Sequence, residues 1–154
     1  MRRQLQNDLR PGHGNALQAC VASILARPMN GNVSDVPNFV EAPEGYASAI
    51  EAYCSGIGVR FEKVTLVEGK GEKAAARLLP SGSEMPPGSR IVVRGTSPRG
   101  DFGHVVVGCV ADDGRTVDLT SEWAHDPHPD GGMLRPPLVW AGIFRGISDD
   151  ATSV

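Results

Sequence analysis

The chain has 154 residues, a formal net charge of −3 and 40% hydrophobic residues, which suits a single domain with a core of its own. The weak charge gives no argument for a nucleic-acid or membrane-surface partner, and no apolar run approaches the roughly 18 residues of a membrane-spanning helix. Three cysteines without framework spacing, and a basic start with no apolar stretch after it, favour reduced thiols in a cytoplasmic protein without a secretory signal.

Two helices are predicted in the first third of the chain. Residues 15–27 place apolar side chains at the spacing of one buried stripe, and Asn15 is a good N-cap for them. Residues 43–55 carry a second apolar face, with Pro43 in the first turn and Gly56 just beyond the last.

The rest of the chain has the pattern of strands. We predict strands at residues 59–67, 90–94, 104–111, 115–123 and 138–144, and a short helix at residues 72–79. Asp113-Gly114 is a strong hairpin signal. Because helices come first and mostly antiparallel strands follow, we expect an α+β domain over residues 1–145, with a flexible tail over residues 146–154.

The segment from Gly14 to Cys20 combines a flexible loop with a helix start. A helix start stabilises a thiolate and offers backbone N–H groups to an oxyanion, which is what a thiol hydrolase needs at its nucleophile. Ala16 occupies that position. Cys20 lies one turn deeper on the apolar stripe, and we interpret it, like Cys54 and Cys109, as a core residue.

A general base and its partner are predicted further along the chain. His104 begins a predicted strand, and a hairpin centred near Asp113 brings it opposite about residue 122. Asp126 follows a few residues later, within reach of the imidazole. Asp118 is the alternative carboxylate, although the same register places it well down the hairpin.

The loop of residues 97–103 precedes His104 and is expected to border the cleft. Arg99, Asp101 and Gly103 are its candidates for contact with substrate, and a solvated loop tip is the alternative interpretation.

A metal site is the competing interpretation of the histidines. His13, His104, His125 and His128, together with Asp126, are its possible ligands. The spacing of His125 and His128 lies in a Pro-rich turn and matches no strong ligand pattern, so we expect neither a metal nor an organic cofactor.

Three motifs resemble the small papain-like-fold cysteine hydrolases of bacteria and phages. They are GNALQACVASIL at residues 14–25 with VPNF at 36–39, SPRGDFGHVVVG at 97–108, and HDPHP at 125–129. The resemblance spans about residues 6 to 134 and implies a papain-like core. It also implies that the position of Ala16 holds the catalytic cysteine, that His104 is the general base and that Asp126 orients it. Gln6, or Gln4 as the fallback, matches the glutamine that completes the oxyanion hole in such folds.

The function that the resemblance implies is hydrolysis of a peptide, isopeptide or other amide bond through an acyl-thioester, with a peptide or protein as the substrate. Alanine is no nucleophile, so the chain as given is expected to be inactive. The presence of His104, Asp126 and the glycine loop favours a cysteine replaced by alanine. The alternatives are a natural pseudoenzyme that binds a peptide, and a thiol transferase that uses the same triad.

Overall fold

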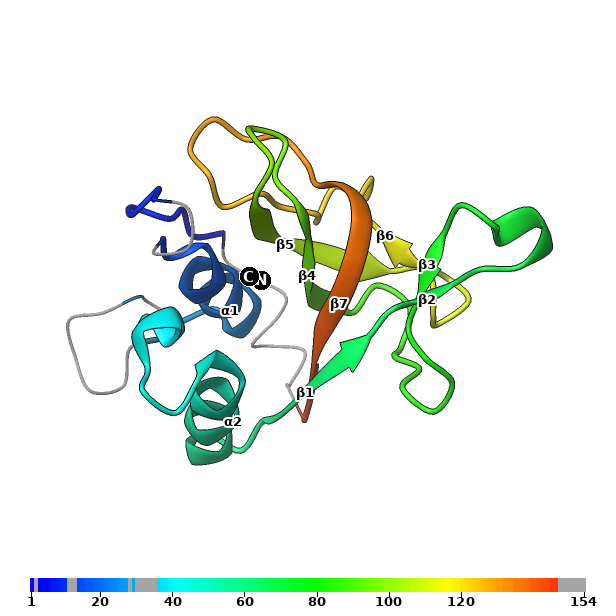
Figure 1. Cartoon of the computed structure of the whole chain (residues 1–154). Coiled ribbons are helices and arrows are strands. Elements are labelled where there is room, and N and C mark those ends of the chain that lie inside the picture. Colours follow the sequence, from blue (N-terminus) through cyan, green and yellow to red (C-terminus); the bar gives the residue numbers. More distant parts are fainter. Residues whose placement is uncertain (2, 11–13, 28, 30–35, 147–154) are drawn as a thin grey trace.

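The computed structural model describes residues 1, 3–10, 14–27, 29 and 36–146, and its centre is a five-stranded antiparallel sheet (Figure 1). In spatial order the strands are β1 (Arg60–Thr65), β7 (Arg135–Arg145), β4 (Arg90–Thr96), β5 (Gly103–Val110) and β6 (Val117–Asp118). A separate pair is formed by β2 (Val67–Glu68) and β3 (Arg77–Leu78). The α+β class expected from the sequence is confirmed.

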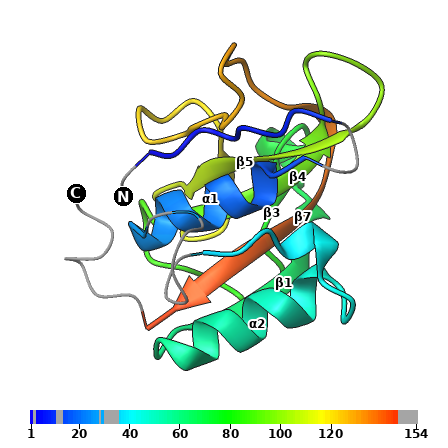
Figure 2. The same ribbon diagram turned by 90° about the vertical axis from the view of Figure 1, so that its left-hand side faces the viewer.

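Helices α1 (Ala16–Leu25) and α2 (Tyr46–Gly56) lie on one face of this sheet (Figure 2). The strands alternate, so Val92 and Val107 pack toward the helices while Val93 packs into a second core on the other face. Helix α1 contacts β4 and β5, and α2 contacts β1. The helices therefore bring the start of α1 to the same side of the sheet as the middle of β4 and β5.

Helix α1 is covered on its outer side as well. Every residue from Leu17 to Leu25 is buried, because the N-terminal segment runs along the helix and the Gln4 backbone N–H donates to Ser23 Oγ at 2.8 Å. The apolar stripe predicted for this helix is real, but even its polar positions are enclosed.

The predicted elements differ from the observed ones at several places. The short helix predicted at residues 72–79 is wrong. A 3₁₀ turn spans Gly71–Lys73 and strand β3 follows, because Leu79, directly after it, goes into the second core. The strand predicted at residues 115–123 shrinks to β6, where Asp118 starts a tight turn by accepting hydrogen bonds from Thr120.

Helix α2 also starts later than predicted. Pro43 is not in its first turn, since the helix begins at Tyr46 after Gly45 in a positive-φ conformation. Gly56 is its last residue rather than the residue beyond it. Apart from Gly146, the predicted tail lies outside the described residues.

No helix in the described part of the chain is long and apolar enough to cross a membrane.

The close packing of β7 against its neighbours predicts a sharp difference between two glycines. A Cβ on Gly142 would lie 2.6 Å from Cε1 of Phe61, whereas a Cβ on Gly56 meets no atom within 4 Å. We expect Gly142→Ala to lower the free energy of unfolding by about 1–3 kcal/mol through overpacking, measured by urea denaturation. Gly56→Ala is the matched control and should leave it unchanged or raise it by about 0.5–1 kcal/mol. Equal effects of the two changes would contradict this packing.

Candidate active site

The start of α1 is held by Asn15 in an unexpected way. Asn15 stands at the N-cap, but its side chain makes no capping hydrogen bond. Its Oδ1 instead accepts from the backbone N–H groups of Asn7 and Asp8, each at 2.9 Å, and its Nδ2 donates to Gln18 Oε1 at 3.0 Å. Asn15 therefore ties the N-terminal segment to the helix and leaves the first turn, which begins at Ala16, without a side-chain cap.

His104 and Asp126 form a buried pair. Nε2 of His104 lies 2.8 Å from Oδ1 of Asp126, and the two side chains are 7% and 1% exposed. A carboxylate only accepts hydrogen bonds, so we assign the proton to Nε2, and Nδ1 is left for other chemistry.

A displaced register brings Asp126 to this place. Strand β5 first pairs with β6, with Cys109 opposite Asp118, and then pairs again where Val107 and His125 exchange two backbone hydrogen bonds of 2.8 Å. The residues between the two pairings bulge out of the ladder. The straight hairpin that we predicted is therefore wrong in register, yet Asp126 and not Asp118 lies against His104.

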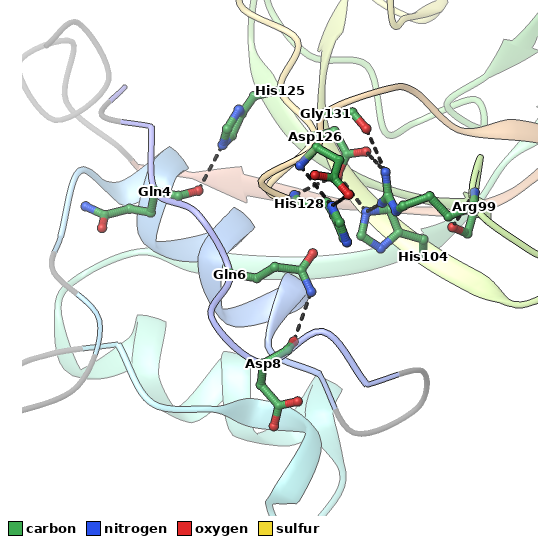
Figure 3. Close-up of polar contacts among 11 residues, drawn as sticks. Gln4, Gln6, Asp8, Arg99, His104, His125, Asp126, His128 and Gly131 are labelled. Atoms are coloured by element: carbon green, nitrogen blue, oxygen red, sulfur yellow. Dashed lines mark hydrogen bonds and ion pairs between the residues drawn. The ribbon is translucent and has the colours of Figure 1, made fainter.

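Arg99 is bound to the same pair (Figure 3). Its Nη1 donates to Asp126 Oδ2 at 3.0 Å and to the carbonyl oxygen of Gly131 at 2.7 Å, and its Nη2 lies 3.1 Å from Nε2 of His104. Because that nitrogen already donates to Asp126, the last contact is a close approach of two N–H groups and not a second hydrogen bond. Arg99, predicted to contact substrate, is thus anchored to the His104–Asp126 pair.

The Asp126 carboxylate stays ionised in this setting. Burial raises its pKa, but the hydrogen bonds from His104, the His128 backbone N–H and Arg99 together outweigh burial, so the pKa lies below its ordinary value. Full pairing of a buried charge by several donors is what makes its burial tolerable.

A cavity of about 300 Å³ opens beside the pair. Its lining includes five of the residues predicted for the site: Gln6, Ala16, Arg99, Gly103 and His104. Asp126 stands behind His104 and outside this lining. The structure does not bring Asp101 to the cavity, since its fully exposed side chain contacts Arg135 at 3.3 Å.

Among the cavity residues that sequence reasoning did not assign to the site are Tyr46, Arg94, His128 and Trp140. Of these four, only His128 belongs to a motif that we considered, and there it was a possible metal ligand. Arg94 and Trp140 lie side by side because β4 pairs with β7, and no signal in the sequence gives that register.

Gln6 borders the cavity with one amide atom unsatisfied. Its backbone N–H donates to the Pro127 carbonyl oxygen at 2.9 Å, and its Nε2 donates to the Asp8 carbonyl oxygen at 3.0 Å. Figure 3 shows the amide nitrogen turned toward Asp8 and the oxygen turned away from it. That oxygen is buried and has no hydrogen-bond partner among the described residues.

The three cysteines are free and buried, as predicted for core residues. Burial raises the pKa of Cys20 well above its ordinary value, and the charge of Asp126 raises it further. Burial also raises the pKa of Cys54 to about 11. None of these thiols has the lowered pKa of a nucleophile.

The histidines are not gathered around one point. His125 contacts the Gln4 carbonyl oxygen at 2.9 Å, and Nδ1 of His128 accepts from the Asp130 backbone N–H at 3.0 Å. His13 lies outside the described residues. Within the described ranges, no group of three or more His, Cys, Asp or Glu side chains is placed to hold a metal ion.

Comparison with protein-family models, with curated proteins and with solved structures finds no match for this chain. What the site does is therefore inferred from its geometry.

The ionised Asp126 predicts a defined acid dependence of stability. Asp126→Asn should lower the free energy of unfolding by about 3 kcal/mol at neutral pH, because it removes one partner of a buried ion pair. The folded-state pKa is depressed, so this stabilisation is complete above the unfolded pKa of about 3.9 and is lost as the pH falls through the lower folded value. Urea denaturation from pH 7 to pH 2 measures the difference in unfolding free energy between Asp126→Asn and the unchanged chain. This difference should shrink as the pH approaches 2.

Asp112→Asn is the control for this experiment, because Asp112 is exposed and its neutralisation should change stability by less than about 0.5 kcal/mol. A difference between Asp126→Asn and the native chain that stays constant down to pH 2 would mean that no ionised carboxylate is held there.

The raised pKa values of the thiols predict that the folded chain is not alkylated at its cysteines. Iodoacetamide at pH 7.5 should alkylate none of the three cysteines within the time in which it alkylates free cysteine, since the thiolate fraction is small and access is blocked. In urea all three should react, which intact-mass measurement counts. Fast native alkylation that Cys20→Ser abolishes would instead make Cys20 a reactive thiol.

Proposed function

We propose that the cavity is the active-site cleft of a thiol hydrolase with a papain-like core, acting on a peptide, isopeptide or other amide bond. Ala16 stands where the nucleophile belongs, so this chain binds the amide without cleaving it. One observation carries the proposal: His104, held by Asp126 in a buried pair, lines the same cavity as the first residue of the uncapped helix α1. A base, an orienting carboxylate and a helix start are the parts that thiol catalysis requires.

The order of these parts along the chain supports the same proposal. The helix with residue 16 at its start comes first, the strand that begins beside His104 comes later, and Asp126 follows that strand. Helix α1 packs on the strand that carries His104. The resemblance of the three motifs implies the same order of parts. The strand pairing that brings Asp126 to His104 is not contained in those motifs.

With a cysteine at position 16 the chemistry is as follows. His104 takes the thiol proton, the thiolate attacks the amide carbon, and the C–N bond breaks as His104 returns the proton to the leaving amine. Water, deprotonated by His104, then attacks the thioester carbon, and the acid and the thiol are released. Asp126 holds the imidazole so that one ring nitrogen is fixed and Nδ1 does this work.

The oxyanion of each tetrahedral intermediate needs donors. The backbone N–H of residue 16 is one of the groups that α1 leaves uncapped. Gln6 supplies the second donor in this proposal, because only one N–H of its amide is used by Asp8.

A second candidate function is a binding module, a pseudoenzyme that holds a peptide in this cleft. Ala16 itself favours it, since the chain has no nucleophile at the helix start. A thiol transferase, which passes the acyl group to an amine instead of water, uses the same parts and is the third candidate. Restoring a thiol at position 16 separates the enzymes from the binding module.

The test is Ala16→Cys. We expect the new thiol to react with iodoacetamide at pH 6.5 at least about tenfold faster than free cysteine, because the helix start and His104 lower its pKa. Peptide mapping by mass spectrometry places the adduct at residue 16, and the three native thiols give little background because they are buried.

Two controls make the test specific. Ala47→Cys puts a thiol in the first turn of α2, a partly buried helix start without a histidine of the site, and should react more slowly than Ala16→Cys because it has only the helix start to lower its pKa. His104→Asn combined with Ala16→Cys should lose most of the gain. If Ala16→Cys is no faster than Ala47→Cys and cleaves no fluorogenic peptide amide, the hydrolase proposal fails and the binding module stands.

A further inference from the structure

The floor of the cavity carries an arginine that the proposed chemistry does not use. Arg94 in β4 pairs with Trp140 of β7 on one side and with Val105 of β5 on the other. These three residues form one row across the sheet and all line the cavity. Tyr46 of α2 stacks on Trp140 with ring centroids 5.8 Å apart. Arg94 thus sits in the middle of an otherwise apolar floor.

Among the described residues, Arg94 has no partner for its charge. No described residue forms a hydrogen bond or an ion pair with its guanidinium, although the residue is partly buried. The other two arginines of the cavity are engaged: Arg10 with Asp8 at 2.6 Å and Arg99 with Asp126 at 3.0 Å. The donors of the Arg94 guanidinium are therefore unused, and the described lining of this cavity contains no carboxylate.

The guanidinium of Arg94 lies directly against Gly103. A Cβ built on Gly103 would lie 1.7 Å from Nη2 of Arg94 and 2.1 Å from Cζ. The planar group therefore rests directly on the Gly103 backbone, which fixes its orientation. A guanidinium held in place loses little freedom when it forms two parallel hydrogen bonds to one carboxylate.

The other residues of the cavity indicate which groups of a ligand lie beside an anion bound at Arg94. Leu9, Val40 and Phe102 line it and are 48%, 39% and 36% exposed, so its rim offers apolar surface. Oε1 of Gln6 is buried from the cavity as well as from water, so it is closed to a ligand.

We propose that Arg94 binds a carboxylate of the ligand, so that the cleft takes an N-acyl amino acid or a peptide that presents a carboxylate at its floor. The amide group of this ligand rests on the proposed function, whereas its carboxylate is inferred from Arg94 alone. The apolar rim then holds the acyl or side-chain group. The carboxylate comes either from a peptide C-terminus or from an acidic side chain, and both fit the same guanidinium.

Three probes separate these sources on the chain as it exists, with Ala16 in place. N-benzoylglycine carries a terminal carboxylate, the α-amide of N-benzoylglutamic acid carries a side-chain carboxylate, and N-benzoylglycinamide carries none. Dissociation constants are measured by NMR titration of the ¹⁵N-labelled protein. We expect at least one acid to bind about tenfold or more tightly than the neutral amide, with shifts at Gly103 and at the Arg94 side-chain N–H.

Variants assign the preference to this guanidinium. Arg94→Gln should abolish the difference between acid and amide, while Arg94→Lys should keep part of it, since a single charge remains without the two-donor geometry. Gly103→Ala keeps the charge but displaces the group, and should lower the preference as well. Arg60→Gln removes an exposed arginine from β1, away from the cavity lining, and should leave the preference unchanged.

The proposal is overturned if the acids bind no more tightly than the amide, if no probe binds up to its solubility limit, or if the preference survives Arg94→Gln in a folded protein. Its failure is distinct from that of the proposed function. A reactive Ala16→Cys thiol without carboxylate preference removes only the role of Arg94. An inert thiol with a clear preference leaves an anion-binding module without hydrolase chemistry.

Discussion

The carboxylate of Asp126 is the group around which the cleft is organised. It is almost completely buried, and an unpaired charge in that position costs several kcal/mol. Its donors come from three separate places: His104 at the start of β5, Arg99 in the loop before it, and the backbone N–H of His128. Because the charge needs all of them, it fixes the loop, the strand and the turn relative to one another. The imidazole is oriented as a consequence of that requirement.

Two arginines of the cavity, Arg94 and Arg99, show how neighbouring groups of the same kind acquire different tasks. Arg99 neutralises Asp126 and also reaches Gly131, so it stabilises the frame of the site. Arg94 lies on the sheet floor over a glycine that admits it, and no described residue pairs with its charge. The first is an internal partner and the second is available to a ligand. The sequence suggested the opposite emphasis, since only Arg99 stands in a recognisable motif.

Local patterns predicted the parts of the fold that local physics decides. The stripe of α1, the turn at Asp113 and the burial of Cys20 follow from spacing and composition, and all are present. The contact between His104 and Asp126 was anticipated, but through a straight hairpin. The actual pairing skips the residues between Asp118 and His125, and such a bulge depends on tertiary packing. Arg94 was missed for the same reason, because its place beside Trp140 is a property of strand pairing.

One wall of the cleft joins the beginning of the described chain to a late part of it. Gln6 is hydrogen-bonded to Pro127, and the Gln4 carbonyl oxygen contacts His125, 121 positions further along. Closing so long a loop costs conformational entropy before any contact repays it. During synthesis the residues of this wall are present once residue 127 has been made, whereas the sheet still lacks β7, which lies between β1 and β4. The cleft floor, which includes Trp140 of β7, is therefore completed last, and a chain truncated before β7 has the residues of the wall without the floor that they face.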